Sequence, residues 1–246
     1  MEPTAYARMA ENEQRHWWFT GRRQILATLL RRELAGTRHP ATLRILEAGC
    51  GSGGNLGMLA AFGTVEAVEY DPGARAIAEH RSGLAIRPCA LPHDLPVPDR
   101  HYDLIALLDV LEHVEEDRAS LAALGAKLKR DGRILVTVPA LPWLWSHHDE
   151  VHHHKRRYTA QSLTEAVADA GLRVDRIGYF NTLLFPLALV RRVGAIVSGR
   201  ATEDDRVPSR WLNAALRTVF AAERHLVGRV RLALGLSLFA VLSVPD

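Results

Sequence analysis

The fold of this chain is decided by the stretch ILEAGCGSGGN, which spans residues 45–55. An apolar run ends at Glu47 and is followed by closely spaced glycines. Glycine accepts positive φ and lets a ligand approach the main chain. The N-terminus of a following helix offers unpaired N–H groups to polar or anionic atoms. The stretch therefore predicts a buried strand that turns into a helix around a nucleotide-like ligand.

The glycine spacing fits two nucleoside cofactors. Gly49, Gly51 and Gly54 match the dinucleotide fingerprint G-x-G-x-x-G, and Glu69 follows where a ribose-binding acid is expected. A plain strand-to-helix turn does not require three glycines next to an acid. On these residues alone, both NAD and S-adenosylmethionine remain open.

The composition is that of an ordinary globular protein. Of 246 residues, 48% are hydrophobic and 24% are charged, and the formal net charge is +3. This charge is too small to favour nucleic acid as a partner, and no apolar run is long enough to predict a transmembrane helix. Two cysteines and the lack of a signal-peptide pattern predict a reduced, cytoplasmic setting. Arginine doublets such as Arg22-Arg23 are expected on solvated helix faces.

Short apolar segments alternate with helical ones along the first part of the chain. Strands are expected at 43–47, 65–69, 84–89, 102–108 and 133–139, and helices at about 5–35, up to 62, 71–81 and 115–130. Strands separated by helices indicate a parallel sheet with right-handed crossovers. Glu47, Glu69 and Asp109 fall at the carboxyl ends of three strands, where such sheets bind ligands.

The second part of the chain continues the pattern and then departs from it. A polar loop at 147–158 precedes a helix at 159–170 and a strand at 172–179, and another strand is expected at 235–244. We expect one domain over 1–246. It comprises a helical N-terminal lid (1–36), a linker (37–42), a cofactor-binding core (43–179), a helical insertion (180–235) and a final strand (236–246).

Four motifs in order resemble the class I S-adenosylmethionine-dependent methyltransferases, most closely the ubiquinone and menaquinone biosynthesis group (methyltransferase type 11/12). They are the glycine turn behind Glu47, then Glu69, LPVPD at 95–99 and LDVLEHV at 108–114. The resemblance implies a Rossmann-like α/β fold with a seven-stranded, mostly parallel sheet. Its last strand is antiparallel, which fits a strand at the very C-terminus.

The resemblance also implies the cofactor and the residues around its amino-acid and ribose parts. The cofactor is S-adenosylmethionine, the product is S-adenosylhomocysteine, and no metal is expected. Gly49, Gly51 and Gly53 would pack against the methionine and ribose. Glu47 would hold the amino group, and Glu69 would take both ribose hydroxyls, since a carboxylate can accept two hydrogen bonds at once.

The same resemblance places the adenine and the sulfonium. Tyr70, Ala90 and Leu91 would border the adenine, and Asp109 and Val110 would lie near the sulfonium end. Leu91 departs from the family pattern, because relatives often have an acid there that accepts from the adenine amino group. Asp94 or a backbone carbonyl would have to take that role.

The loop at 147–158 carries five of the 12 histidines and borders the substrate side of such a fold. His148 and His152 have the spacing of H-E-x-x-H, but Asp149 replaces the glutamate, so the pattern does not favour a metal site. A histidine titrates near neutral pH and can take a proton from an oxygen, nitrogen or carbon nucleophile. The candidates are His148 or His154, with Asp149 as the orienting carboxylate or a second base.

Arg157 and Tyr158, at the end of this loop, have two readings. They could bind a substrate carboxylate, or the loop residues could form a salt-bridged segment that holds the N-terminal helix. A subgroup of the family shows similar patterns here, WSxxD with HxRRY, and a similar HWWF with GRR near the N-terminus, at 16–23. That subgroup typically acts on small molecules or biosynthetic intermediates.

Two regions outside the core are expected near the substrate. Trp17 and Trp18 are either core residues or part of a lid that contacts substrate and excludes water. The insertion at 180–235 could wall a hydrophobic pocket, form a homodimer face or lie on a membrane surface, and we favour the pocket.

The sequence thus predicts methyl transfer from S-adenosylmethionine to the oxygen, nitrogen or carbon of a small molecule. The alternatives are an NAD(P)-dependent oxidoreductase and a non-catalytic S-adenosylmethionine-binding partner protein.

Overall fold

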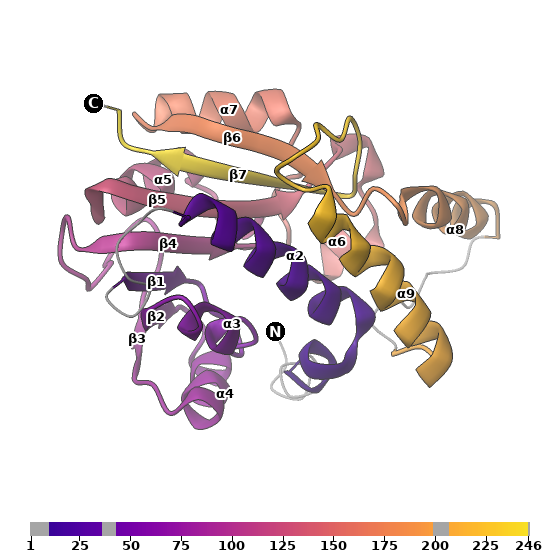
Figure 1. Cartoon of the computed structure of the whole chain (residues 1–246), viewed down its shortest axis with the longest axis horizontal. Coiled ribbons are helices and arrows are strands. Elements are labelled where there is room, and N and C mark those ends of the chain that lie inside the picture. The colour runs from indigo at the N-terminus through magenta and orange to yellow at the C-terminus, as the bar shows by residue number, and fades with distance from the viewer. Residues whose placement is uncertain (1–9, 36–42, 199–206, 246) are drawn as a thin grey trace.

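The computed structural model describes residues 10–35, 43–198 and 207–245, and shows a central sheet with helices on both faces (Figure 1). The expected linker at 37–42 and the start of the N-terminal helix lie outside the described residues. So does the side chain of His148, although its backbone is helical. Among the described residues, no helix combines the length and the apolar character that crossing a membrane would require.

The sheet has the strand order β3-β2-β1-β4-β5-β7-β6. β7 runs antiparallel to both of its neighbours, β5 and β6, whereas the other described pairs are parallel. This arrangement confirms the Rossmann-like fold with an antiparallel last strand. The strands are β1 Arg44–Ala48, β2 Thr64–Glu69, β3 Ile86–Pro88, β4 Tyr102–Leu108, β5 Leu128–Pro139, β6 Arg173–Phe180 and β7 Ser237–Ser243.

Buried apolar side chains alternate between the two faces of the sheet. Ile45 in β1 joins one hydrophobic cluster, and the next residue, Leu46, joins the other. The first face is covered by α2 (Trp17–Glu33), α3 (Leu56–Ala60), α4 (Pro72–Ser82) and α9 (Arg210–Ala222). The second face is covered by α5 (Asp117–Gly125) and α7 (Ala160–Asp169). α2 lies across the front of the sheet in Figure 1 and packs against α9.

Short helical segments lie mainly beyond the carboxyl ends of the strands. They are η2 (Leu111–His113), η3 (Pro142–Leu144), α6 (His147–Val151) and η4 (Glu223–His225), and the insertion contributes α8 (Phe185–Ser198) as well as α9. Leu187, Val190 and Trp211 on α8 and α9 are exposed apolar residues. The pocket, dimer and membrane readings of this insertion stay predictions.

Local capping explains where two helices begin. The Asp71 carboxylate accepts hydrogen bonds from the backbone N–H groups of Gly73 and Ala74, at 2.8 and 2.9 Å, and Pro72 occupies the first turn of α4. Thr159 and Ser162 form a reciprocal capping box at the start of α7. Both helix starts were predicted from the sequence.

Tertiary contacts change three predicted boundaries. The helix expected over 5–35 is interrupted at His16, whose ring caps α2 by accepting from the backbone of Trp18. The helix expected over 115–130 ends at Gly125, because Leu128 already pairs with Tyr102 and begins β5. The polar loop at 147–158 contains the short helix α6.

Candidate functional site

The glycine turn after β1 has room for a ligand at one position. Gly49, Gly51 and Gly53 all have positive φ, at 74°, 53° and 81°. A Cβ at Gly49 would lie 2.7 Å from the Val110 side chain, and one at Gly53 would lie 3.2 Å from Ala78. A Cβ at Gly51 would meet no atom of the described residues within 4 Å. Gly49 and Gly53 therefore serve close packing, whereas the space next to Gly51 is open, and its contact with a ligand stays a prediction.

Glu47 is a buried acid with one oxygen in use. The Asn55 side-chain amide donates to Oε1 at 3.0 Å, and Oε2 has no hydrogen-bond partner among the residues that the structure describes. Burial raises the pKa of Glu47 to about 8. A buried acceptor without a partner costs free energy. The ammonium group of an amino-acid ligand would satisfy this oxygen.

Glu69, at the end of β2, is fixed by the main chain. Its Oε2 accepts from the N–H of Gly51 at 2.7 Å, and its Oε1 accepts from the N–H of Asp71 at 2.9 Å. A carboxylate offers about four acceptor positions. Glu69 therefore keeps capacity for two hydroxyl donors while its orientation is set.

Asp109, just after β4, is paired with an arginine from α2. Arg22 Nη2 lies 2.6 Å from Asp109 Oδ2, and the Thr137 hydroxyl donates to Asp109 Oδ1 at 3.0 Å. Arg22 is only 3% exposed, and its guanidinium lies over the Trp18 ring, 5.3 Å from the centroid. The expectation that Arg22 faces solvent is therefore wrong, because α2 packs on the sheet and the cation meets a carboxylate there.

The segment before α2 also reaches the glycine turn. Glu13 accepts from the Ser52 hydroxyl and from Arg81, the latter at 3.2 Å. A Cβ on Gly54 would lie 2.6 Å from the Glu13 carboxylate. Sequence reasoning missed Glu13, since nothing in its local pattern indicates a partner so far along the chain.

The residues expected around an adenine lie beside this turn. Tyr70 follows Glu69 and is exposed, whereas Ala90 and Leu91 are half-buried in the loop after β3. Val110 is half-buried and faces Gly49. Their contacts with a cofactor stay predictions.

Asp149 is the centre of the histidine-rich loop. It is fully buried and accepts from the backbone N–H and hydroxyl of Ser146, at 2.8 and 3.0 Å. Arg157 holds both of its oxygens, with Nε at 2.7 Å and Nη2 at 3.0 Å. Burial opposes ionisation, but the hydrogen bonds from His154 and Arg157 outweigh it and hold the pKa of Asp149 below its usual range.

Arg157 and Tyr158 take part in a salt-bridged loop. Arg157 also donates to the carbonyl of Ala140, at 3.1 Å. Tyr158 is 2% exposed, and its hydroxyl donates to Asp117 at 2.9 Å. Their described partners lie in the loop itself, after β5 and on α5, rather than on the N-terminal helix. A role of either residue in binding substrate stays a prediction.

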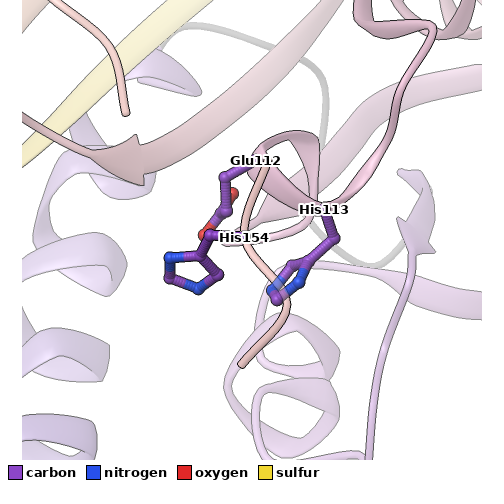
Figure 2. Close-up of side chains that lie close together, drawn as sticks. All are labelled: Glu112, His113 and His154. Atoms are coloured by element: carbon purple, nitrogen blue, oxygen red, sulfur yellow. The ribbon is translucent and has the colours of Figure 1, made fainter. Parts of the chain in front are cut away.

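His154 stands next to two residues that follow β4. Its Nδ1 lies 2.9 Å from Asp149 Oδ1, and its ring meets the His113 ring edge-on, 4.7 Å between centroids. Glu112 is 1% exposed, and its Oε2 has no hydrogen-bond partner in residues 10–35, 43–198 and 207–245. Figure 2 shows the side chains of Glu112, His113 and His154 gathered in one place. The sequence did not predict the proximity of Glu112 and His113 to His154.

The two N-terminal tryptophans differ in their surroundings. The Trp17 ring packs edge-on against Phe220 of α9, with centroids 5.7 Å apart, and its backbone N–H donates to Asn213. Trp18 lies under the Arg22 guanidinium, close to Asp109. Trp17 thus joins α2 to the insertion, and Trp18 lies nearer to the carboxylates. Contact of either tryptophan with substrate stays a prediction.

A family model of the methyltransferase domain matches residues 15–177. This chain belongs to the methyltransferase domain family. The match decides between the two nucleoside cofactors that the glycine spacing left open, and confirms the recognition of a class I S-adenosylmethionine-dependent methyltransferase.

Among curated relatives, a probable S-adenosylmethionine-dependent methyltransferase of Mycobacterium tuberculosis (strain H37Rv) is 29% identical over 141 residues. The matched region covers 56% of this chain and 52% of that protein. The chain therefore spans about half the length of the curated relatives it matches.

Solved structures share the fold of this chain. A methyltransferase in complex with the Trm112 activator of Haloferax volcanii has a TM-score of 0.61 at 18% identity, covering 99% of this chain and 95% of that one. The geranyl diphosphate C-methyltransferase of Streptomyces coelicolor A3(2), bound to S-adenosyl-L-homocysteine, has a TM-score of 0.61 at 15% identity. The match covers 89% of this chain and 78% of that one.

Proposed function

We propose that this protein transfers the methyl group of S-adenosylmethionine to a small-molecule acceptor that must lose a proton, and that His154 takes that proton. The observation that carries the proposal is the His154–Asp149 pair, at 2.9 Å, on the side of the site where β4 ends. Glu112 is close to both sides of the site. One of its carboxylate oxygens lies within 4.8 Å of a His154 ring nitrogen. Burial, followed by the charge of Asp109, raises the pKa of Glu112 well above the usual range.

The residues on the cofactor side fit S-adenosylmethionine. The unpaired Oε2 of Glu47 suits the ammonium group of the methionine part. The open space next to Gly51 leaves room for the rest of the methionine part. Glu69 has acceptor capacity for the ribose hydroxyls. When bound, this cofactor supplies an electrophilic methyl carbon.

On the acceptor side, the residues of the chain orient a base. Asp149 lies 2.9 Å from Nδ1 of His154, and a carboxylate at this nitrogen stabilises the imidazolium that forms when Nε2 takes a proton. Asp149 is itself fixed by Arg157 and Ser146, which keeps the ring in one orientation. Next to Asp109, α2 places Arg22 against the carboxylate and Trp18 against Arg22, which would limit the access of water to this side of the site.

A screen of candidate acceptors by mass spectrometry, looking for products heavier by CH₂, tests the proposal. With a productive acceptor, His154→Ala should reduce turnover at least ~100-fold, the lower range for loss of a general base. Its affinity for S-adenosylhomocysteine, measured by calorimetry, should stay at the wild-type value. His148→Ala is measured in parallel, because His148 is the other candidate base.

His147→Ala is the matched control, because His147 lies on the same loop with its side chain 67% exposed. Wild-type turnover in His154→Ala would refute the assignment of the base. Tight binding of S-adenosylhomocysteine without a methylated product from any acceptor would instead favour a non-catalytic binding protein.

A further inference from the structure

We propose that Glu112, His113 and His154 form a binding site for a divalent metal ion, with zinc as the ion that best suits these ligands. The inference rests on the proposed methyl transfer and revises one part of it, because His154 becomes a ligand of the metal ion, and the ion rather than His154 activates the acceptor. It also departs from the sequence analysis, in which only the spacing of His148 and His152 raised the question of a metal.

The three side chains present their ligand atoms to one another. One ligand atom from each residue lies within 4.8 Å of the other two. Zinc bonds of roughly 2.0–2.2 Å in a tetrahedral site require ligand atoms about 3.5 Å apart. Side-chain rotations that move each atom by about 1 Å would close this difference, without a change in the backbone.

Glu112 supplies the independent sign that a cation belongs here. Glu112 is 1% exposed, and within the described part of the chain its Oε2 has no hydrogen-bond partner. Removing a carboxylate from water costs several kcal/mol unless a cation or hydrogen-bond donors compensate it. A metal ion bound by this oxygen would provide that compensation. Figure 2 shows the two imidazoles near the Glu112 side chain.

The surroundings of His154 are those of a metal-binding histidine. Ligand histidines generally use their second nitrogen to bind a carboxylate or carbonyl, which fixes the ring. Asp149 fills this position at 2.9 Å from Nδ1, and Arg157 holds Asp149 from the other side. In this arrangement the ion would bind Nε2 of His154.

The donor set and its exposure point to a reactive site rather than a structural one. Two imidazoles and one carboxylate are the ligands of many catalytic zinc sites, which keep a further position open. His113 is exposed, so a ligand can reach the cluster from that side. Coordination lowers the pKa of a bound hydroxyl or water. An acceptor held there would lose its proton to solvent, with His154 acting as a ligand instead of the base.

Metal binding is tested on the untagged full chain with Zn²⁺ alone, by calorimetry and by elemental analysis of the dialysed protein. We expect one ion per chain, and an affinity at least ~100-fold weaker in Glu112→Gln, His113→Ala and His154→Ala, since each removes one of three ligands. Co²⁺ in the same site should give visible absorption bands that these variants lose. His147→Ala should bind like the wild type.

Several outcomes separate the metal site from the proposed function. Absence of stoichiometric Zn²⁺ binding, or equal binding by His113→Ala and the wild type, would overturn the metal site. His113 is exposed, so its removal leaves the fold intact and keeps the test decisive. A chelated protein that methylates its acceptor at the full rate would also overturn the site, while leaving the proposed function in place. Stoichiometric zinc binding without any methylated product would overturn the proposed function and leave the metal site in place.

Discussion

The carboxylates on the two sides of the site differ in how many of their acceptor positions the protein itself fills. On the cofactor side, Glu47 has one oxygen without a partner, and Glu69 uses only two of its acceptor positions. On the acceptor side, Asp149 receives hydrogen bonds from Ser146, Arg157 and His154 on both of its oxygens. Carboxylates suited to a ligand keep acceptor capacity, whereas a carboxylate that positions other residues is saturated by the protein.

Replacing the saturated carboxylate should have the largest effect. Asp149→Ala leaves the buried guanidinium of Arg157 without its anion, and breaking one partner of a buried pair costs about 3–5 kcal/mol. The free energy of unfolding, measured with urea, should fall by that amount. Glu150→Ala, next in the chain and exposed, should change it by less than ~0.5 kcal/mol. Equal stabilities of the two variants would contradict a positioning role for Asp149.

On the cofactor side, Glu69→Gln should reduce affinity more than stability. A glutamine would turn its NH₂ group toward one of the backbone N–H groups that Glu69 now accepts from, at Gly51 or Asp71. It also replaces charge-assisted hydrogen bonds to the ligand, worth about 1.5–3 kcal/mol each. Calorimetry should show S-adenosylhomocysteine binding weaker by roughly 10–100-fold. Undiminished affinity would remove Glu69 from the ribose site.

The unpaired oxygen of Glu47 makes cofactor binding depend on pH. Its pKa is about 8, and only the ionised form attracts an ammonium group. Affinity for S-adenosylhomocysteine should therefore fall as the pH decreases, by roughly 20-fold between about pH 8.5 and 6.5, because the binding-competent fraction shrinks. Glu47→Gln should bind more weakly, with a flatter profile. A wild-type profile without this slope would separate Glu47 from the ammonium group.

The smallest effect is expected from a methyl group at Gly51, and the chain offers a matched control. Gly51 and Gly83 both have positive φ, and neither would place a Cβ within 4 Å of another atom. Alanine at either position should lower the free energy of unfolding by about 1–2 kcal/mol through backbone strain. Only Gly51→Ala should also weaken S-adenosylhomocysteine binding, by about tenfold. Equal affinities in both variants would show that the ligand does not approach Gly51.

The sequence predicted the cofactor side because its signals are local. The strand, the glycine turn and Glu69 follow each other within a short stretch, and their backbone conformation depends on neighbouring residues. The φ values at Gly49 and Gly51 agree with the predicted turn. The mostly parallel sheet with an antiparallel β7 also agrees with the prediction, since the C-terminal apolar run fits the last strand of the family.

The helix boundaries show where local patterns fail. Residues 126–130 continue a helical pattern, but Leu128 pairs with Tyr102 of β4 and belongs to β5. Arg22 fits a solvated helix face, but it is buried against Asp109. In both cases a partner distant in the sequence supplies more free energy than the local preference does.

By itself, the sequence determined the family, the fold and the cofactor side, because glycine conformation and strand-end acids are read from adjacent residues. Only the tertiary structure decided the acceptor side. Glu112 and His113 follow β4, whereas His154 comes from the loop after α6. Packing brings one ligand atom of each residue within 4.8 Å of the other two. Likewise, Arg22 of α2 reaches Asp109 across the site. Such clusters have no sequence spacing that could reveal them, since their geometry exists only once the sheet and its loops are assembled.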